Sequence, residues 1–271
     1  MDWERSSLPS SASSWCSRSS SSSADTISSN HKLRPAAFAA NPAAPADINF
    51  TSFSARSTVA ASTDILFSEA ISFLQAGRTR EAEKTLRKLV RRTSDHPLAL
   101  SVLGAILVGT GKYDEAERFL RSAVRLNPGA HVALYNHGLA LKALGRPDEA
   151  LTQFTQALAI TPDDAETLSN RGTVYNDLKN FEAALADFDR ATALQPNYAL
   201  AHHNRGNALS GLARYEDALA AYQRAVALMP GLIDSWAAIG LSLQKLERHD
   251  ESAAAFETAR QRAEAANARR H

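Results

Sequence analysis

The sequence contains one cysteine and no apolar run long enough to cross a bilayer. Cys16 has no partner for an intramolecular disulfide and no second thiolate for a metal site, so packing alone must stabilise the fold. A spanning helix needs about 20 mostly apolar residues, which argues against membrane insertion. Because 30 Lys and Arg balance 29 Asp and Glu, the chain as a whole is not drawn to nucleic acid. We expect a protein of a reducing compartment, the cytoplasm.

The first 62 residues lack glycine and any helical or strand period, and 18 of them are serine. Such a segment buries too little apolar surface to offset the entropy of ordering it, so we predict a disordered tail over residues 1–62. Three alternatives stay open: an organelle-targeting or specialised secretion signal, a phosphorylatable regulatory arm, and a start codon assigned too far upstream.

Motifs for catalysis and metal binding are missing as well. The eight histidines are not accompanied by paired cysteines or by two histidines at helical spacing around a glutamate. The stretch Gly109 to Lys112 resembles a phosphate loop, but Tyr113 stands where a serine or threonine is required. We therefore predict no enzymatic activity, no metal and no cofactor.

Beyond residue 62 the sequence repeats every 34 residues. The columns with this period are Gly104, Gly138, Gly172, Gly206 and Gly240; Pro128, Pro162, Pro196 and Pro230; Ala82, Ala116, Ala150, Ala184 and Ala218; and Ala123, Ala157, Ala191, Ala225 and Ala259. Four columns with one period indicate one repeated structural unit. Six units tile residues 63–266 as 63–96, 97–130, 131–164, 165–198, 199–232 and 233–266, and residues 267–271 extend the last helix.

A 34-residue unit with small, aromatic and proline positions in this order resembles the tetratricopeptide repeat (TPR). The resemblance implies an all-α, right-handed superhelical α-solenoid of six helix-turn-helix repeats, with the first helix of each unit on a concave face. Small residues at positions 8 and 20 are expected where the two helices of a unit approach to about 8–10 Å. Bulky residues at position 24, such as Phe154 and Phe188, are expected to pack against the neighbouring helices.

Position 6 of the first helix carries asparagine in three consecutive units, at Asn136, Asn170 and Asn204. In the family this position faces the groove, and an amide can pair with both the N–H and the C=O of an extended peptide. The column is similar to the asparagine ladder of O-linked N-acetylglucosamine transferases. We predict that these residues bind a peptide together with neighbouring groove residues, namely Tyr135, His203, Lys142, Asn207 and Asp177.

The predicted function is therefore a non-enzymatic scaffold that binds an extended segment of a partner protein. One alternative is that the asparagines only bond water or the next helix, and that Arg171 and Arg205 at position 7 form pairs between helices. Another is a detached or truncated substrate-recognition region of a protein like an O-linked N-acetylglucosamine transferase, without its catalytic domain. Self-association through the end helices also stays open.

Two other partner classes are not favoured by the sequence. Family members that grip an acidic chaperone tail use Lys and Arg at positions 2, 5 and 6, and this chain has no such clamp, with Phe67, Ser101, Tyr135, Ser169, His203 and Ala237 at position 5. Unit one holds a basic cluster of Arg87, Lys88, Arg91 and Arg92, which is typical of a solvated end face. We predict no nucleic-acid partner.

Overall fold

A computed structural model describes the backbone of residues 54–268 and the side chains of residues 62–268. Every element in this part of the chain is an α-helix, which confirms the predicted all-α class. The helices are α2 (Ser54–Gln75), α3 (Thr79–Arg92), α4 (Pro97–Gly109), α5 (Tyr113–Leu126), α6 (His131–Ala143), α7 (Pro147–Ile160), α8 (Ala165–Asp177), α9 (Phe181–Leu194), α10 (Ala199–Gly211), α11 (Tyr215–Leu228), α12 (Ile233–Lys245) and α13 (His249–Ala268).

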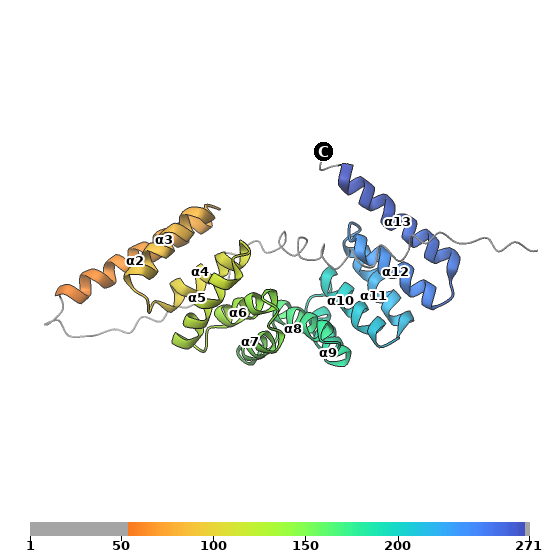
Figure 1. The fold of residues 1–271 in the computed structure, drawn as a ribbon, viewed down its shortest axis with the longest axis horizontal. Coiled ribbons are helices and arrows are strands. Elements are labelled where there is room, and N and C mark those ends of the chain that lie inside the picture. Colours follow the sequence, from red (N-terminus) through yellow and green to blue (C-terminus); the bar gives the residue numbers. More distant parts are fainter. Residues whose placement is uncertain (1–53, 269–271) are drawn as a thin grey trace, which may run out of the picture.

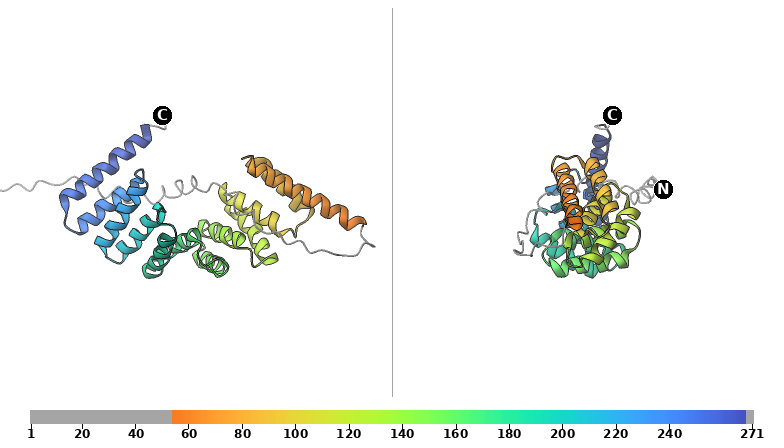
Figure 2. Two further views of the ribbon diagram at one scale, coloured as in Figure 1. Left: turned by 180° about the vertical axis from the view of Figure 1, so that it is seen from behind. Right: turned by 90° about the vertical axis from the view of Figure 1, so that its left-hand side faces the viewer.

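The helices form consecutive pairs that stack into a solenoid. Each first helix packs against the second helix of its own unit. First helices of successive units also touch: α4 contacts α6, and α8 contacts α10. Figure 1 shows the pairs arranged in an arch whose two ends turn to the same side. Figure 2 shows the arch from behind and along its length, where the repeats lie behind one another. The first helices line the inner side of this arch.

The helix boundaries follow the repeat columns. Helix α7 begins at Pro147, where a missing N–H costs nothing because the first N–H groups of a helix have no partner within it. The second helices α5, α7, α9 and α11 end two residues before the prolines of position 32. Asp164 caps α8 by accepting a hydrogen bond from the Thr167 N–H at 3.3 Å. Local signals in the sequence therefore define where each helix begins and ends.

The glycine column and the bulky column meet inside each unit. A Cβ atom on Gly138 would lie 2.6 Å from Phe154 Cε1, and one on Gly206 would lie 2.5 Å from Tyr222 Cε1. Phe154 is fully buried by this contact. Position 24 thus packs against neighbouring helices, as expected: the Phe154 ring fills the space that the absent Cβ of Gly138 leaves on α6, and it clusters with Val174 of α8.

The two ends of the solenoid differ from the central units. Helix α2 begins at Ser54, so residues 54–62, which we assigned to a disordered tail, extend the first helix; this stretch contains no proline or glycine to stop it. The rest of the predicted tail, with Cys16, lies outside the described residues. At the other end α13 runs to Ala268, and Arg262 lies over the Trp236 ring at 5.3 Å. The last helix thus extends beyond the sixth unit, as the sequence predicted.

Candidate functional site

A cavity of about 950 Å³ lies on the inner side of the arch, lined mainly by the first helices α6, α8, α10 and α12. Seven of the eight predicted site residues line it: Tyr135, Lys142, Asn170, Asp177, His203, Asn204 and Asn207. Asn136, the eighth, is not among the lining residues. The sequence interpretation assigned no role here to three further lining residues, Glu166, Tyr198 and Asp234. We call this cavity the groove.

The amide of Asn170 is held by groups of its own chain. Its Oδ1 accepts a hydrogen bond from Lys142 Nζ at 2.9 Å, and its Nδ2 lies 3.2 Å from the Tyr135 hydroxyl and 3.0 Å from the Glu166 carbonyl oxygen. These contacts join α6 to α8. Both Nδ2 hydrogens are therefore used within the chain, whereas Oδ1 has a second lone pair that can accept a ligand N–H.

The other two ladder asparagines are less fully engaged. Asn136 Nδ2 donates to the Val132 carbonyl one turn earlier at 2.8 Å. Asn204 Nδ2 reaches Thr173 Oγ1 at 3.4 Å, a long contact. In the described part of the chain neither Oδ1 atom accepts a hydrogen bond. Each therefore has an acceptor free for a ligand N–H.

A second polar network surrounds His203. The Tyr222 hydroxyl donates to Asn207 Oδ1 at 2.8 Å, Asn207 Nδ2 lies 3.3 Å from His203 Nε2, and His203 Nδ1 lies 2.8 Å from Ser235 Oγ. This order of donors assigns the proton of the imidazole to Nδ1. Burial lowers the pKa of His203, although the charge of Asp234 opposes the shift. The side chain is neutral at pH 7.

Burial also changes the acid–base properties of three groove residues. It lowers the pKa of the Lys142 ammonium and raises the pKa of the Asp177 carboxyl, and the attraction between the two charges opposes both shifts. Burial, with the Glu166 charge nearby, raises the pKa of the Tyr135 hydroxyl well above its ordinary value. Tyr135 therefore stays protonated and can donate a hydrogen bond into the groove.

Models of the tetratricopeptide repeat match residues 67–131, 135–199, 199–232 and 233–264. The chain belongs to the tetratricopeptide repeat family. Stacked repeats of this kind form extended concave binding surfaces, and this TPR protein is a protein-binding scaffold.

Solved structures share the TPR fold. MamA (41-end) from Desulfovibrio magneticus RS-1 is 25% identical, with 62% of this chain and 96% of that chain covered and a TM-score of 0.59. A TPR protein from Parabacteroides merdae is 22% identical over 74% and 80% of the two chains, with a TM-score of 0.62. PilW, a type IV pilus biogenesis factor, is 20% identical over 74% and 91%, with a TM-score of 0.63. No curated protein matches significantly.

The arginines at position 7 of the TPR units serve the stack. Arg171 donates to both carboxylate oxygens of Asp187, at 2.8 and 2.7 Å, and Arg205 lies 2.5 Å from Asp189. The Arg171–Asp187 pair joins α8 to α9 within unit four. The Arg205–Asp189 pair joins α10 of unit five to α9 of unit four. These side chains match the alternative that we gave for Arg171 and Arg205, pairs between helices.

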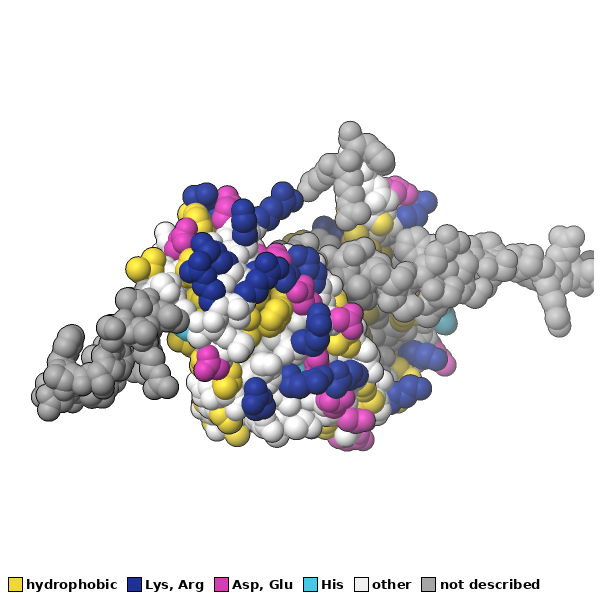
Figure 3. Space-filling view, turned by 60° about the vertical axis from the view of Figure 1, so that its left-hand side comes forward, with side chains coloured by type: hydrophobic (Ala, Val, Ile, Leu, Met, Phe, Trp, Pro, Cys, Tyr) yellow, Lys and Arg dark blue, Asp and Glu magenta, His cyan; other side chains and the backbone are white. Residues whose placement is uncertain are grey.

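The charged outer surface of the TPR stack is mixed. Figure 3 shows Lys and Arg side chains gathered over the N-terminal repeats, with Asp and Glu side chains among them. Arg87 of the basic cluster bonds both Glu83 and Glu115 and thereby joins α3 to α5, while Lys88, Arg91 and Arg92 are exposed. Within the described residues, no group of three or more His, Cys, Asp or Glu side chains could hold a metal ion. No described helix is long and apolar enough to span a membrane.

Proposed function

We propose that this TPR protein holds an extended segment of a partner protein in the groove, without catalysing a reaction. The observation that carries the proposal is the convergence of Tyr135, Asn170, Asn204 and Asn207 from three successive first helices on one cavity of about 950 Å³. Amides and hydroxyls of this kind pair with a peptide backbone whatever its side chains are.

The spacing of the repeats suits an extended chain. Neighbouring first helices lie roughly 10 Å apart, and an extended peptide advances about 3.3 Å per residue. One unit therefore faces about three peptide residues. The ladder positions 136, 170 and 204 would contact roughly six to nine residues of a partner.

The three asparagines contribute differently in this proposal. The free Oδ1 atom of Asn204, which lines the groove, accepts a peptide N–H group directly. The free Oδ1 atom of Asn136 does so where the bound segment runs past the cavity, since Asn136 is not among the lining residues. Asn170 must exchange its Nδ2 bond to Tyr135 for a bond to a peptide carbonyl, so its net contribution as a donor is smaller.

The test is selection of peptides from a random nonapeptide library displayed on phage, with the full chain immobilised. Selected peptides are then synthesised, and their affinity is measured by fluorescence polarisation. Replacing all three asparagines (Asn136→Ala, Asn170→Ala, Asn204→Ala) should weaken binding at least about tenfold, since each lost hydrogen bond is worth about 0.5–1.5 kcal/mol. The control Asn267→Ala, an exposed asparagine near the end of α13, should bind like the wild type.

Failure to select any peptide, or equal affinity of the wild type and the triple variant, would show that the groove is not the peptide site. Thermal unfolding of each variant checks that a loss of binding is not a loss of folding.

The likeness of units three to five to the substrate-binding repeats of O-linked N-acetylglucosamine transferases remains a prediction. On that hypothesis the chain recognises the same kind of extended substrate but transfers no sugar. A glycosyltransfer assay on the purified protein tests it, and measurable transfer would overturn the non-enzymatic proposal. The cytoplasmic location is likewise an expectation from composition.

A further inference from the structure

Three carboxylates line the groove, and of these only Asp177 has a cation within the described chain, Lys142, close enough to affect its pKa. Glu166, Asp177 and Asp234 line the cavity, and none of them forms an ion pair or a side-chain hydrogen bond with another described residue. By contrast, Asp187 and Glu117, which lie between the helices of the stack, each bond an arginine. The unpaired carboxylates of the groove are therefore available to a ligand.

The groove has fewer positive charges than carboxylates. Among the described residues that line the cavity, Lys142 is the one Lys or Arg side chain. Its ammonium group already donates to Asn170. His203 carries no charge at pH 7, because burial lowers its pKa. The charges of Lys142 and Asp177 attract each other and cancel, so Glu166 and Asp234 leave the cavity with a net negative charge.

The hydrogen-bond inventory also has a surplus of acceptors. Asn176 lines the groove and donates through Nδ2 to the Asn204 carbonyl at 3.0 Å, but its Oδ1 is buried and has no hydrogen-bond partner. A buried acceptor without a donor costs free energy that a ligand N–H would recover. Tyr135, Tyr198 and Phe181 add aromatic rings to the lining, and such rings attract cations.

The positions of two carboxylates define a spacing. Glu166 and Asp234 occupy position 2 of units four and six, and Leu200 occupies the same position between them. Two repeats correspond to roughly 20 Å, or about six residues of extended peptide. Side chains six residues apart point to the same side of an extended chain, because the side-chain period is two. One peptide can therefore present two cations to both carboxylates at once.

We propose that the groove selects an extended peptide segment that carries lysine or arginine side chains, with one contacting Glu166 and a second, about six residues away, contacting Asp234. Asp177 and the buried Oδ1 of Asn176 accept further N–H groups of the same segment. The inference rests on the proposed function, since it names the class of peptide that the same groove binds. Acidic peptides are repelled by the same charges.

The sequences selected from the nonapeptide library test this inference. We expect lysine and arginine to be enriched several-fold over the unselected library, and aspartate and glutamate to be depleted. Replacing Glu166 by Gln and Asp234 by Asn together should abolish the enrichment. It should weaken binding of a selected basic peptide several-fold, since Asp234 is exposed and Glu166 half-buried, and each such ion pair is worth about 0.2–1 kcal/mol. The control Glu216→Gln removes an exposed glutamate of α11 outside the groove and should change neither result.

The outcomes separate the two proposals. Peptides that are selected, lose affinity in the triple asparagine variant and show no excess of basic residues would support the groove but overturn the charge preference. A library that yields no peptide would overturn both. A third measurement is the salt dependence: binding of the basic peptide should weaken between 50 mM and 300 mM NaCl, whereas a peptide with glutamine at the basic positions should change little.

Discussion

Single residues decide how closely the two helices of a unit approach. The glycine at position 8 leaves room for the aromatic ring at position 24, and Gly138 with Phe154 is the pair at the centre of unit three. A methyl group added there would lie 2.6 Å from the ring, a distance at which one of the two must move.

We predict that Gly138→Ala destabilises the protein by roughly 1–2 kcal/mol, since overpacking outweighs the gain in helix propensity. This corresponds to about 2–8 °C in the midpoint of thermal unfolding. Gly109→Ala is the matched control, because a Cβ at this helical glycine meets nothing within 4 Å; its midpoint should stay the same or rise slightly. Equal midpoints for the two variants would contradict the contact that we assign to position 8.

A second residue-scale feature lies in the turn inside each unit. Its left-handed residue is glycine in the first three units, at φ angles near 70°, but Lys179, Ala213 and Glu247 in the last three, at φ angles near 60°. A side chain with Cβ costs about 1–2 kcal/mol in this conformation.

Ala213→Gly should therefore stabilise the protein, by about 0.5–1 kcal/mol after the greater entropy of glycine in the unfolded chain is subtracted. Ala220→Gly, at an exposed position within helix α11, should instead destabilise it by about 1 kcal/mol. Thermal unfolding of both variants checks the prediction, and a decrease for Ala213→Gly would show that this turn is not strained.

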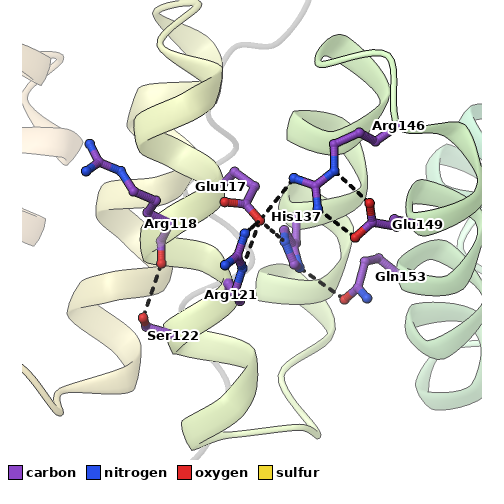
Figure 4. Close-up of polar contacts among 8 residues, drawn as sticks. All are labelled: Glu117, Arg118, Arg121, Ser122, His137, Arg146, Glu149 and Gln153. Carbon is purple, nitrogen blue, oxygen red and sulfur yellow. Dashed lines mark hydrogen bonds and ion pairs between the residues drawn. The ribbon is translucent and has the colours of Figure 1, made fainter.

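At the scale of the elements, buried polar groups join one unit to the next. Figure 4 shows Glu117 of α5 facing Arg121 of the same helix, His137 of α6 and Arg146 at the start of α7. His137 Nδ1 lies 3.2 Å from Gln153 Oε1, so it donates, and Nε2 points to Glu117 at 3.6 Å without a hydrogen bond. Burial lowers the pKa of this imidazole, although Gln153 and Glu117 oppose the shift.

A lowered pKa in the folded state makes stability depend on pH. The unfolded chain takes up the proton first as the pH falls, so the neutral imidazole stabilises the fold above about pH 6.5, and this contribution is lost at lower pH. We expect the thermal midpoint to fall between pH 7.5 and pH 5.5, and to fall less in His137→Gln. Part of the decline should remain, because burial also lowers the pKa of His202 and His203. Parallel curves for the wild type and the variant would rule out His137 as a source.

At the scale of the whole molecule, the groove is a product of stacking. Its lining comes from units three to six, so the cavity exists only when these repeats are stacked. The same stacking gives the outer face its mixed charge and leaves the unpaired carboxylates on the inner side. The scaffold and its candidate binding surface therefore form or unfold together.

The fold could be predicted from the sequence because its determinants are local and repeated. The 34-residue columns fixed the helix pairs and their turns, and proline and glycine marked the ends of most helices. The start of α2 was placed too late, because serine-rich composition concealed a stretch without helix breakers at residues 54–62. Seven of the eight predicted residues line the groove because position 6 and its neighbours recur on the same face of each first helix, while their role in binding stays a prediction.

The tertiary structure alone decided which polar groups remain free. Asn170 and Lys142 are 28 residues apart and bond each other, so neither side chain is as available as its position suggested. Glu166 and Asp234, which are 68 residues apart, line one cavity only because the repeats stack, and the role proposed for them depends on that stacking. Repeat periodicity encodes which face a residue occupies, whereas hydrogen bonds and charge balance between repeats depend on the residues that differ from unit to unit, and these become partners only in space.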